Sequence, residues 1–151
     1  MTPRLTALAA AASVAACATS GPSVESRTIL ARPQATKRAE VTHILLGYSW
    51  LASKYRQMGM SLDPRAEKRN ETATEQLAQQ LLSRIERGEL IEPLMKEFSE
   101  DPGSAANGQS YTVDPGSQMV EEFKDLALRL SPGEAGIVKS AFGYHVMKRI
   151  Q

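Results

Sequence analysis

The stretch of sequence that decides the fold is Val41-Thr42-His43-Ile44-Leu45-Leu46-Gly47. Its first six residues are mostly apolar or β-branched and lack a polar alternation, which is typical of a strand buried on both faces, and the glycine ends the run. Two more extended segments, residues 136–140 and 144–150, lie near the end of the chain. The link between them, Ala141-Phe142-Gly143, is so short that the two segments are predicted to pair antiparallel.

Two helices are predicted after the opening strand. The first begins at residue 71, where apolar residues start to recur at helical spacing, with Asn70 as its N-cap and Gly88 just past its end. The second covers residues 91–98, with its apolar residues on one side. It stops at residues 99–103, where proline and glycine suit the centre of a tight turn.

The second half of the chain continues the alternation of helices and strands. Residues 110–113 form a short strand candidate, and residues 119–130 form an amphipathic helix that is closed by Ser131-Pro132-Gly133. The predicted order is therefore strand, helix, helix, strand, helix, strand, strand. This order indicates a small α+β domain in which helices cover one sheet.

The charge and cysteine content exclude several classes of protein. The chain has 151 residues, with 18 Lys and Arg against 17 Asp and Glu, a formal net charge of +1. That length indicates one domain, and so small a net charge supplies no bulk field that would attract nucleic acid. The single cysteine, Cys17, excludes both a disulfide framework and a cysteine-based zinc site, so no metal is expected.

The first residues have the pattern of an export signal. One arginine is followed by an uncharged stretch over residues 5–16, which is too short for a spanning helix. The tetrapeptide Val14-Ala15-Ala16-Cys17 resembles the lipobox of bacterial lipoproteins. We therefore predict a signal peptide over residues 1–16 and a diacylglyceryl group on Cys17. The alternative is an ordinary signal peptide that is cut after Ala18.

Lipidation of Cys17 implies an extracytoplasmic location. Two or three acyl chains suffice for stable anchoring to a bacterial membrane. Ala18, which follows the cysteine in place of an aspartate, favours the outer over the inner membrane by the sorting habit of many lipoproteins. Residues 17–40 are rich in small and polar residues and show no apolar period, so a flexible tether is predicted there, followed by the globular domain over residues 41–151.

Five separated segments resemble the parvulin-type peptidyl-prolyl isomerases, and the resemblance covers residues 41–151. The segments are Thr42-His43-Ile44-Leu45-Leu46, Phe98-Ser99-Glu100-Asp101-Pro102-Gly103-Ser104-Ala105, Gln118-Met119-Val120-Glu121-Glu122-Phe123, Ser131-Pro132-Gly133-Glu134 and Phe142-Gly143-Tyr144-His145-Val146. They follow one another in the order found in the family. The resemblance implies a parvulin-like member of the FKBP-like superfold, with a four-stranded antiparallel sheet surrounded by three to four helices.

The resemblance also implies an active site without a cofactor. His43 and His145 match the two central histidines of the family and Asp101 stands at the position facing them, so these three are the predicted catalytic residues. Taken alone, a histidine in a buried strand is more often structural, and an aspartate also suits a turn before proline. The predicted substrate-binding residues, of which two on one helix face match the family's proline-ring pocket, are Ser110, Gln118, Met119, Phe123, Ser140 and Phe142.

The implied reaction is rotation about an X-Pro peptide bond. The barrier to this rotation is about 18–20 kcal/mol, and no covalent bond is made or broken. Some family members carry cysteine where this chain has Asp101, and a carboxylate there excludes a thiolate-type mechanism. The implied partners are unfolded exported polypeptides that contain X-Pro bonds.

One departure from the family pattern leaves a second function open. The family commonly has Gly-Gly-Asp-Leu-Gly followed by an aromatic residue, whereas this chain has Gly108-Gln109-Ser110-Tyr111-Thr112-Val113. The leucine that lines the proline pocket is missing, although Tyr111 could refill the space. The alternative function is therefore a catalytically weak binding module that acts as a periplasmic chaperone.

The stretch between Tyr48 and Asn70 is polar and basic, with five Lys or Arg against two Asp or Glu, a local net charge of +3. It is predicted to be a long loop with one helical turn around residues 50–58. Some parvulins use cations in the equivalent loop to select phosphorylated Ser or Thr before proline. Mixed charge on a solvated loop is the favoured interpretation here.

Overall fold

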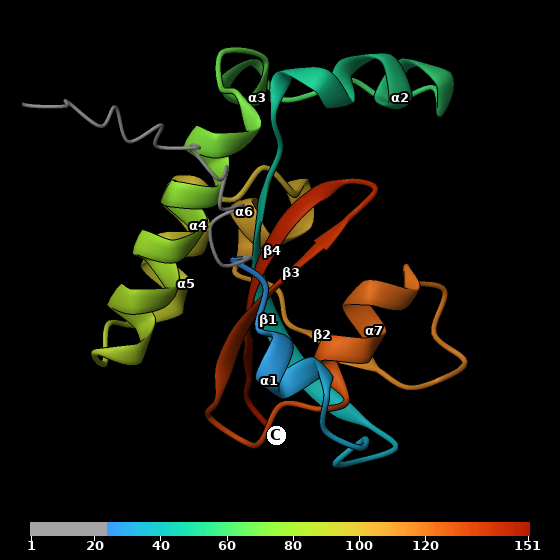
Figure 1. The fold of residues 1–151 in the computed structure, drawn as a ribbon, viewed down its shortest axis with the longest axis vertical. Helices are drawn as coiled ribbons and strands as arrows, with labels where there is room; N and C mark the ends of the chain where they lie inside the picture. Colours follow the sequence, from blue (N-terminus) through green and yellow to red (C-terminus); the bar gives the residue numbers. More distant parts are fainter. Residues whose placement is uncertain (1–23) are drawn as a thin grey trace, which may run out of the picture.

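The computed structural model describes residues 24–151 and contains a four-stranded sheet (Figure 1). The strands are β1 (Ala39–Leu46), β2 (Tyr111–Val113), β3 (Ala135–Ser140) and β4 (Gly143–Arg149). They lie in the order β2-β1-β4-β3, and every neighbouring pair is antiparallel. The predicted four-stranded antiparallel sheet and the α+β class are therefore confirmed.

Helices surround this sheet and are mostly short. They are α1 (Arg27–Leu30), the 3-10 turn η1 (Ser49–Leu51), α2 (Ala52–Gln57), α3 (Pro64–Glu67), α4 (Glu71–Glu86), α5 (Ile91–Phe98), α6 (Pro102–Asn107) and α7 (Glu121–Ala127). The beginning of α4 is confirmed, because the side chain of Asn70 accepts the backbone N–H of Ala73 at 2.8 Å. Its end is also as predicted, since Gly88 adopts a positive φ of 96° just past the helix.

The short helix α6 lies where a turn followed by a loop was predicted. Pro102 occupies its first turn, where a missing N–H costs nothing, and Asp101 caps it by accepting the backbone N–H of Ser104 at 2.9 Å. The Asp-Pro-Gly sequence therefore starts a helix instead of closing a turn. This cap also fixes the position of the Asp101 side chain.

Each face of the sheet is covered by different helices (Figure 1). On one face, Ile44 and Leu46 of β1 pack in one core cluster with Leu81 of α4 and Met95 of α5. On the other face, Val41 belongs to a second cluster with residues of α7 and α1. β1 is thus buried on both faces, as its unbroken apolar run predicts.

Residues 24–40 differ from the predicted flexible tether. The backbone N–H of Ser26 donates to the carbonyl of Ile137 at 2.9 Å, and the N–H of Ile137 donates to the Ser26 hydroxyl at 2.9 Å. Ile29 is buried against α7, and Arg32 forms an ion pair with Glu134 at 2.9 Å. This segment has too few apolar residues to show a period, but it covers the outer edge of β3, whose backbone groups need partners.

The predictions of a signal peptide over residues 1–16 and of lipidation at Cys17 lie outside the described residues. Within residues 24–151, no helix has both the length and the apolar character needed to cross a membrane.

Candidate functional site

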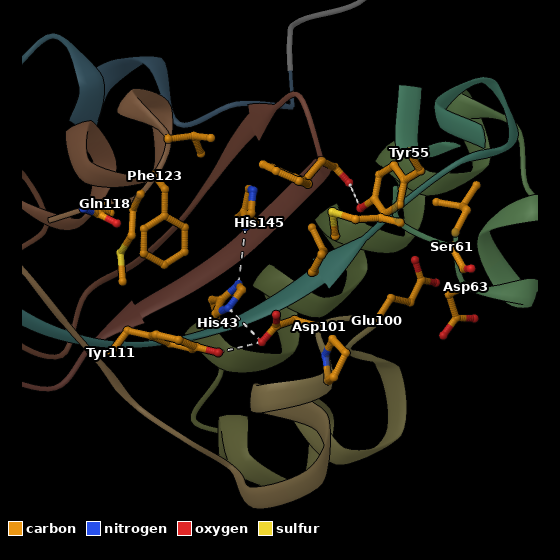
Figure 2. A pocket seen from close by; sticks show the side chains of 17 residues that line it. His43, Tyr55, Ser61, Asp63, Glu100, Asp101, Tyr111, Gln118, Phe123 and His145 are labelled. Atoms are coloured by element: carbon orange, nitrogen blue, oxygen red, sulfur yellow. Dashed lines mark hydrogen bonds and ion pairs between the residues drawn. The ribbon is translucent and has the colours of Figure 1, made fainter. Parts of the chain in front are cut away.

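A cavity of about 560 Å³ opens beside α7, and its floor is formed by β1 and β4 (Figure 2). It extends from the segment that precedes α7 to the region that follows α2. The residues that line it are His43, Leu45, Tyr55, Met60, Ser61, Leu62, Asp63, Glu100, Asp101, Pro102, Tyr111, Gln118, Met119, Val120, Phe123, Phe142 and His145.

The register of β1 and β4 brings two histidines together on the cavity floor. His43 pairs with Met147 and Leu45 pairs with His145, so the histidines are offset by two residues on one face of the sheet. Diagonal neighbours of this kind lie within reach of ring side chains. The two Nδ1 atoms are 3.4 Å apart, and both residues are buried.

Asp101 lies beside the histidine pair and is held in its ionised form. Its Oδ2 lies 3.6 Å from Nε2 of His43, and it accepts the Tyr111 hydroxyl at 2.7 Å and the backbone N–H of Ser104 at 2.9 Å. The contact with His43 and these two hydrogen bonds hold the pKa of Asp101 well below its usual range, because they stabilise the charged form. A carboxylate is therefore present beside the rings at neutral pH.

A chain of hydrogen bonds continues behind the histidines. Burial lowers the pKa of His145 to about 3, so its ring is neutral at neutral pH. Nε2 of His43 faces the carboxylate of Asp101, and its Nδ1 faces Nδ1 of His145. Nε2 of His145 is hydrogen-bonded to the Ser140 hydroxyl at 2.7 Å, and the same hydroxyl accepts the N–H of Phe142 at 3.1 Å. These bonds fix both ring orientations.

An aromatic notch lies at the α7 end of the cavity. The ring of Phe123 meets His43 and His145 edge-on, at centroid distances of 5.0 and 5.3 Å. Tyr111 lies 5.2 Å from His43 and 6.4 Å from Phe123, and Met119 adds a flexible apolar wall. Tyr111 therefore refills the part of the wall for which the sequence offers no leucine. The notch is apolar and open to the cavity, as a proline ring requires.

Residues from the basic stretch 48–70 form the opposite end of the cavity (Figure 2). Tyr55 of α2 donates its hydroxyl to the carbonyl of Phe142 at 2.9 Å, and the two rings meet edge-on at 6.0 Å. Met60 and Leu62 add apolar surface. The sequence does not predict these wall residues, because no apolar period runs through the stretch. The only signal was an isolated aromatic or aliphatic residue between polar ones.

Two arginines of the same stretch are engaged in ion pairs. Arg65 pairs with Asp63 at 3.0 Å and also donates to two backbone carbonyls, and Arg69 pairs with Glu100. The cavity is lined by the carboxylates of Asp63, Glu100 and Asp101 but by no Lys or Arg. Only Asp63 of these three belongs to the loop, so the loop presents no cation to the cavity although it is basic as a whole.

The cavity brings together seven of the nine predicted site residues. These are His43, Asp101, His145, Gln118, Met119, Phe123 and Phe142. Ser140 does not line it and lies behind His145. Ser110 also lies outside it, because β2 pairs with the beginning of β1 and the Ser110 hydroxyl meets Glu40 at 2.6 Å. In the described part of the chain, no group of three or more His, Cys, Asp or Glu is arranged to hold a metal ion.

Comparison with known families and proteins agrees with this geometry. A family model described as the PPIC-type PPIASE domain matches residues 26–150. The chain is 47% identical over 85 residues to Chaperone SurA of Pseudomonas syringae pv. tomato, a match that covers 55% of this chain and 20% of that protein. It is 39% identical over 75 residues to Foldase protein PrsA of Geobacillus kaustophilus, covering 49% of this chain and 27% of that protein. The chain thus matches only about a quarter or less of either relative's length.

Two solved structures are also similar to this chain. The solution structure of TbPIN1 matches with a TM-score of 0.61 and 25% identity, over 77% of this chain and 99% of that one. The structure of Pin from the psychrophilic archaeon Cenarcheaum symbiosum matches with a TM-score of 0.52 and 29% identity, over 80% of this chain and 100% of that one. Both of these proteins are matched over nearly their whole length.

Proposed function

The chain belongs to the PPIC-type peptidyl-prolyl isomerase domain family, and we propose that it catalyses cis/trans rotation about X-Pro bonds in unfolded polypeptides. One observation carries this proposal: two histidines in contact and an ionised Asp101 lie on the floor of an open cavity with an aromatic notch at its end. Nothing in this arrangement requires a nucleophile.

The cavity suits a reaction whose only obstacle is amide conjugation. The barrier to X-Pro rotation is about 18–20 kcal/mol and arises from the partial double bond between carbon and nitrogen. Phe123 and Met119 would hold the proline ring while the preceding residue rotates. A site that holds one side of the bond and favours the twisted amide lowers the barrier, because only interactions that are stronger in the transition state accelerate the reaction.

Asp101 supplies the electrostatic part of the proposed mechanism. A planar amide carries negative charge on its oxygen, and this charge falls when rotation breaks conjugation. A fixed carboxylate near that oxygen therefore disfavours the planar amide more than the twisted one. His43 and Tyr111 hold the carboxylate in place before the substrate arrives, so little reorganisation accompanies the reaction.

The alternative is a binding module that holds unfolded segments and catalyses little. The reason to consider it is the missing leucine of the proline pocket. Tyr111 lines the cavity beside Phe123 and supplies an aromatic wall there. The aromatic notch is therefore complete, which favours the enzyme. The name of the relative Chaperone SurA is compatible with both functions.

We also propose that the protein acts outside the cytoplasm, anchored by a lipid on Cys17, on the side of a bacterial outer membrane that faces the periplasm. The support is the lipobox-like Val14-Ala15-Ala16-Cys17 and the uncharged stretch before it. Its substrates would then be exported polypeptides during folding.

Exchange NMR on a short X-Pro peptide tests the isomerase. The wild-type chain should increase the cis/trans exchange rate, and a His43→Ala/His145→Ala variant should lose most of that increase. Asp101→Asn is a milder variant with the same shape, and Ser110→Ala, which lies outside the cavity, is the matched control that should retain activity. A wild-type chain that binds unfolded polypeptides but leaves the exchange rate unchanged would favour the binding module.

A further inference from the structure

Exposed apolar side chains are concentrated on a short segment next to the cavity. Trp50 is 75% exposed, Met58 40% and Met60 45%, and these three lie within eleven residues of sequence. Among the described residues only two other large apolar side chains, Leu90 and Ile150, are exposed to this degree. Apolar surface gathered in one place marks an interaction site more often than isolated residues do.

The helical turns of this segment separate a buried side from an exposed one. Leu51 and Tyr55 are buried in the core, so the opposite side faces solvent. Trp50 lies in η1 and Met58 caps the end of α2, eight residues later, with exposed Lys54 midway between them. Residues four apart follow one another along the same side of a helix. We call Trp50, Met58 and Met60 the α2 surface.

The α2 surface meets the cavity at one residue, Met60. Met60 belongs to both, since it lines the cavity and is exposed. Tyr55 of α2 also lines the cavity, where its hydroxyl donates to the carbonyl of Phe142. In Figure 2, Tyr55 lies at the end of the cavity opposite Phe123, with the two histidines between them. A polypeptide that places its proline against Phe123 and continues across the histidines therefore leaves the cavity at the α2 surface.

The distances suit a short extension of the same polypeptide. Five residues separate Trp50 from Tyr55, which corresponds to about 7–8 Å along a helix. An extended peptide advances about 3.3–3.6 Å per residue, so it passes Trp50 about two residues after leaving the cavity. We propose that the α2 surface binds apolar side chains that the client polypeptide carries about two residues beyond the segment that crosses the cavity, an inference that rests on the proposed isomerase function.

The α2 surface would select a class of substrate. The favoured clients are unfolded segments in which large apolar residues lie close to the X-Pro bond. A folded surface loop with polar neighbours would use only the cavity. The α2 surface would thus direct the isomerase to chains that have not yet buried their apolar residues.

Trp50 reports on this contact directly, because it is the single tryptophan of the chain. The probe is a Trp-free peptide with one central proline and with Phe and Leu at the proposed positions on both sides. Its binding should shift the emission of Trp50 to shorter wavelength, whereas the same peptide with Ser at those positions should leave the emission unchanged. Equal shifts with both peptides, or none with either, overturn the inference. A shift of the Trp50 emission with rising protein concentration alone indicates binding of a second copy and also overturns the inference. An emission that already lies at short wavelength in the free chain overturns it as well.

Activity measurements separate this inference from the proposed function. Trp50→Ser and Met58→Ser should lower kcat/KM on the apolar peptide by about five- to tenfold and leave a proline tetrapeptide unaffected. Leu90→Ser is the matched control, since Leu90 is 66% exposed but does not line the cavity, and it should change neither rate. If the tetrapeptide is isomerised and the variants act on both peptides like wild type, only the inference fails. If no peptide is isomerised by the wild type, the proposed function fails.

Discussion

Replacement of Tyr111 by phenylalanine removes one hydroxyl from the site and leaves the ring in place. That hydroxyl donates to Oδ2 of Asp101 at 2.7 Å, while the ring packs against His43 and Phe123. A hydrogen bond to a charged group contributes about 1.5–3 kcal/mol. The Asp101 side chain is 26% exposed, so solvent replaces part of the loss and the lower figure, about 1.5 kcal/mol, applies. At about 1.4 kcal/mol per unit, the pKa of Asp101 should rise by roughly one unit.

The pH dependence of stability follows from the sign of this change. The pKa of Asp101 is depressed in the folded protein, so its contribution to the free energy of unfolding is present above the unfolded pKa and is lost as pH falls through the folded pKa. Tyr111→Phe should therefore be less stable than wild type by about 1.5 kcal/mol at neutral pH. The difference should shrink as acidification protonates Asp101 first in the variant and then in the wild type.

Urea unfolding at pH 7 and at successively lower pH measures this difference, and exchange NMR measures activity. If the transition state loses the full stabilisation of about 1.5 kcal/mol, kcat/KM should fall about tenfold. Tyr144→Phe is the matched control, because its hydroxyl also bonds to carboxylates, those of Glu71 and Glu75, but lies outside the cavity. The control should lose stability and keep its activity. A Tyr111→Phe variant with wild-type stability at pH 7 and unchanged activity would refute the role given to this hydroxyl.

Three further predictions concern the core, the anchor and the substrate. Leu126→Ala should lower the free energy of unfolding by about 2–5 kcal/mol in urea titrations, because the side chain is fully buried against the sheet; a loss below about 1 kcal/mol would contradict this packing. Cys17→Ser should move the exported protein from the membrane to the soluble fraction, and unchanged fractionation would argue against lipidation. Among peptides that differ only before proline, Lys should give a several-fold higher kcat/KM than Glu or phosphoserine, because the ionised Asp101 lines the cavity without a Lys or Arg partner, whereas Asp63 and Glu100 are already paired with arginines; a preference for phosphoserine would show that the basic loop binds phosphate.

The identity and order of the main elements could be predicted from local sequence. The apolar run at residues 41–46, the helical spacing after Asn70 and the short link at residues 141–143 each specify a local structure within a few residues. The packing of residues 24–38 could not, because its hydrogen bonds join Ser26 to Ile137, more than a hundred residues away. Helix α6 was missed because Asp-Pro-Gly suits a helix start as well as a turn, and only the surrounding packing selects between them.

The sequence by itself determined which residue types the site contains, since His43 and His145 lie in recognisable strands and Phe123 lies in a recognisable amphipathic helix. Only the tertiary structure decided that they meet. The strand order places β4 beside β1, and the register offsets the histidines by two residues on one face. A slip of one residue would send one ring to the opposite face, and no local pattern encodes that register. The end of the cavity opposite Phe123, with Tyr55 and Leu62, likewise exists only because tertiary packing brings a polar segment beside the site.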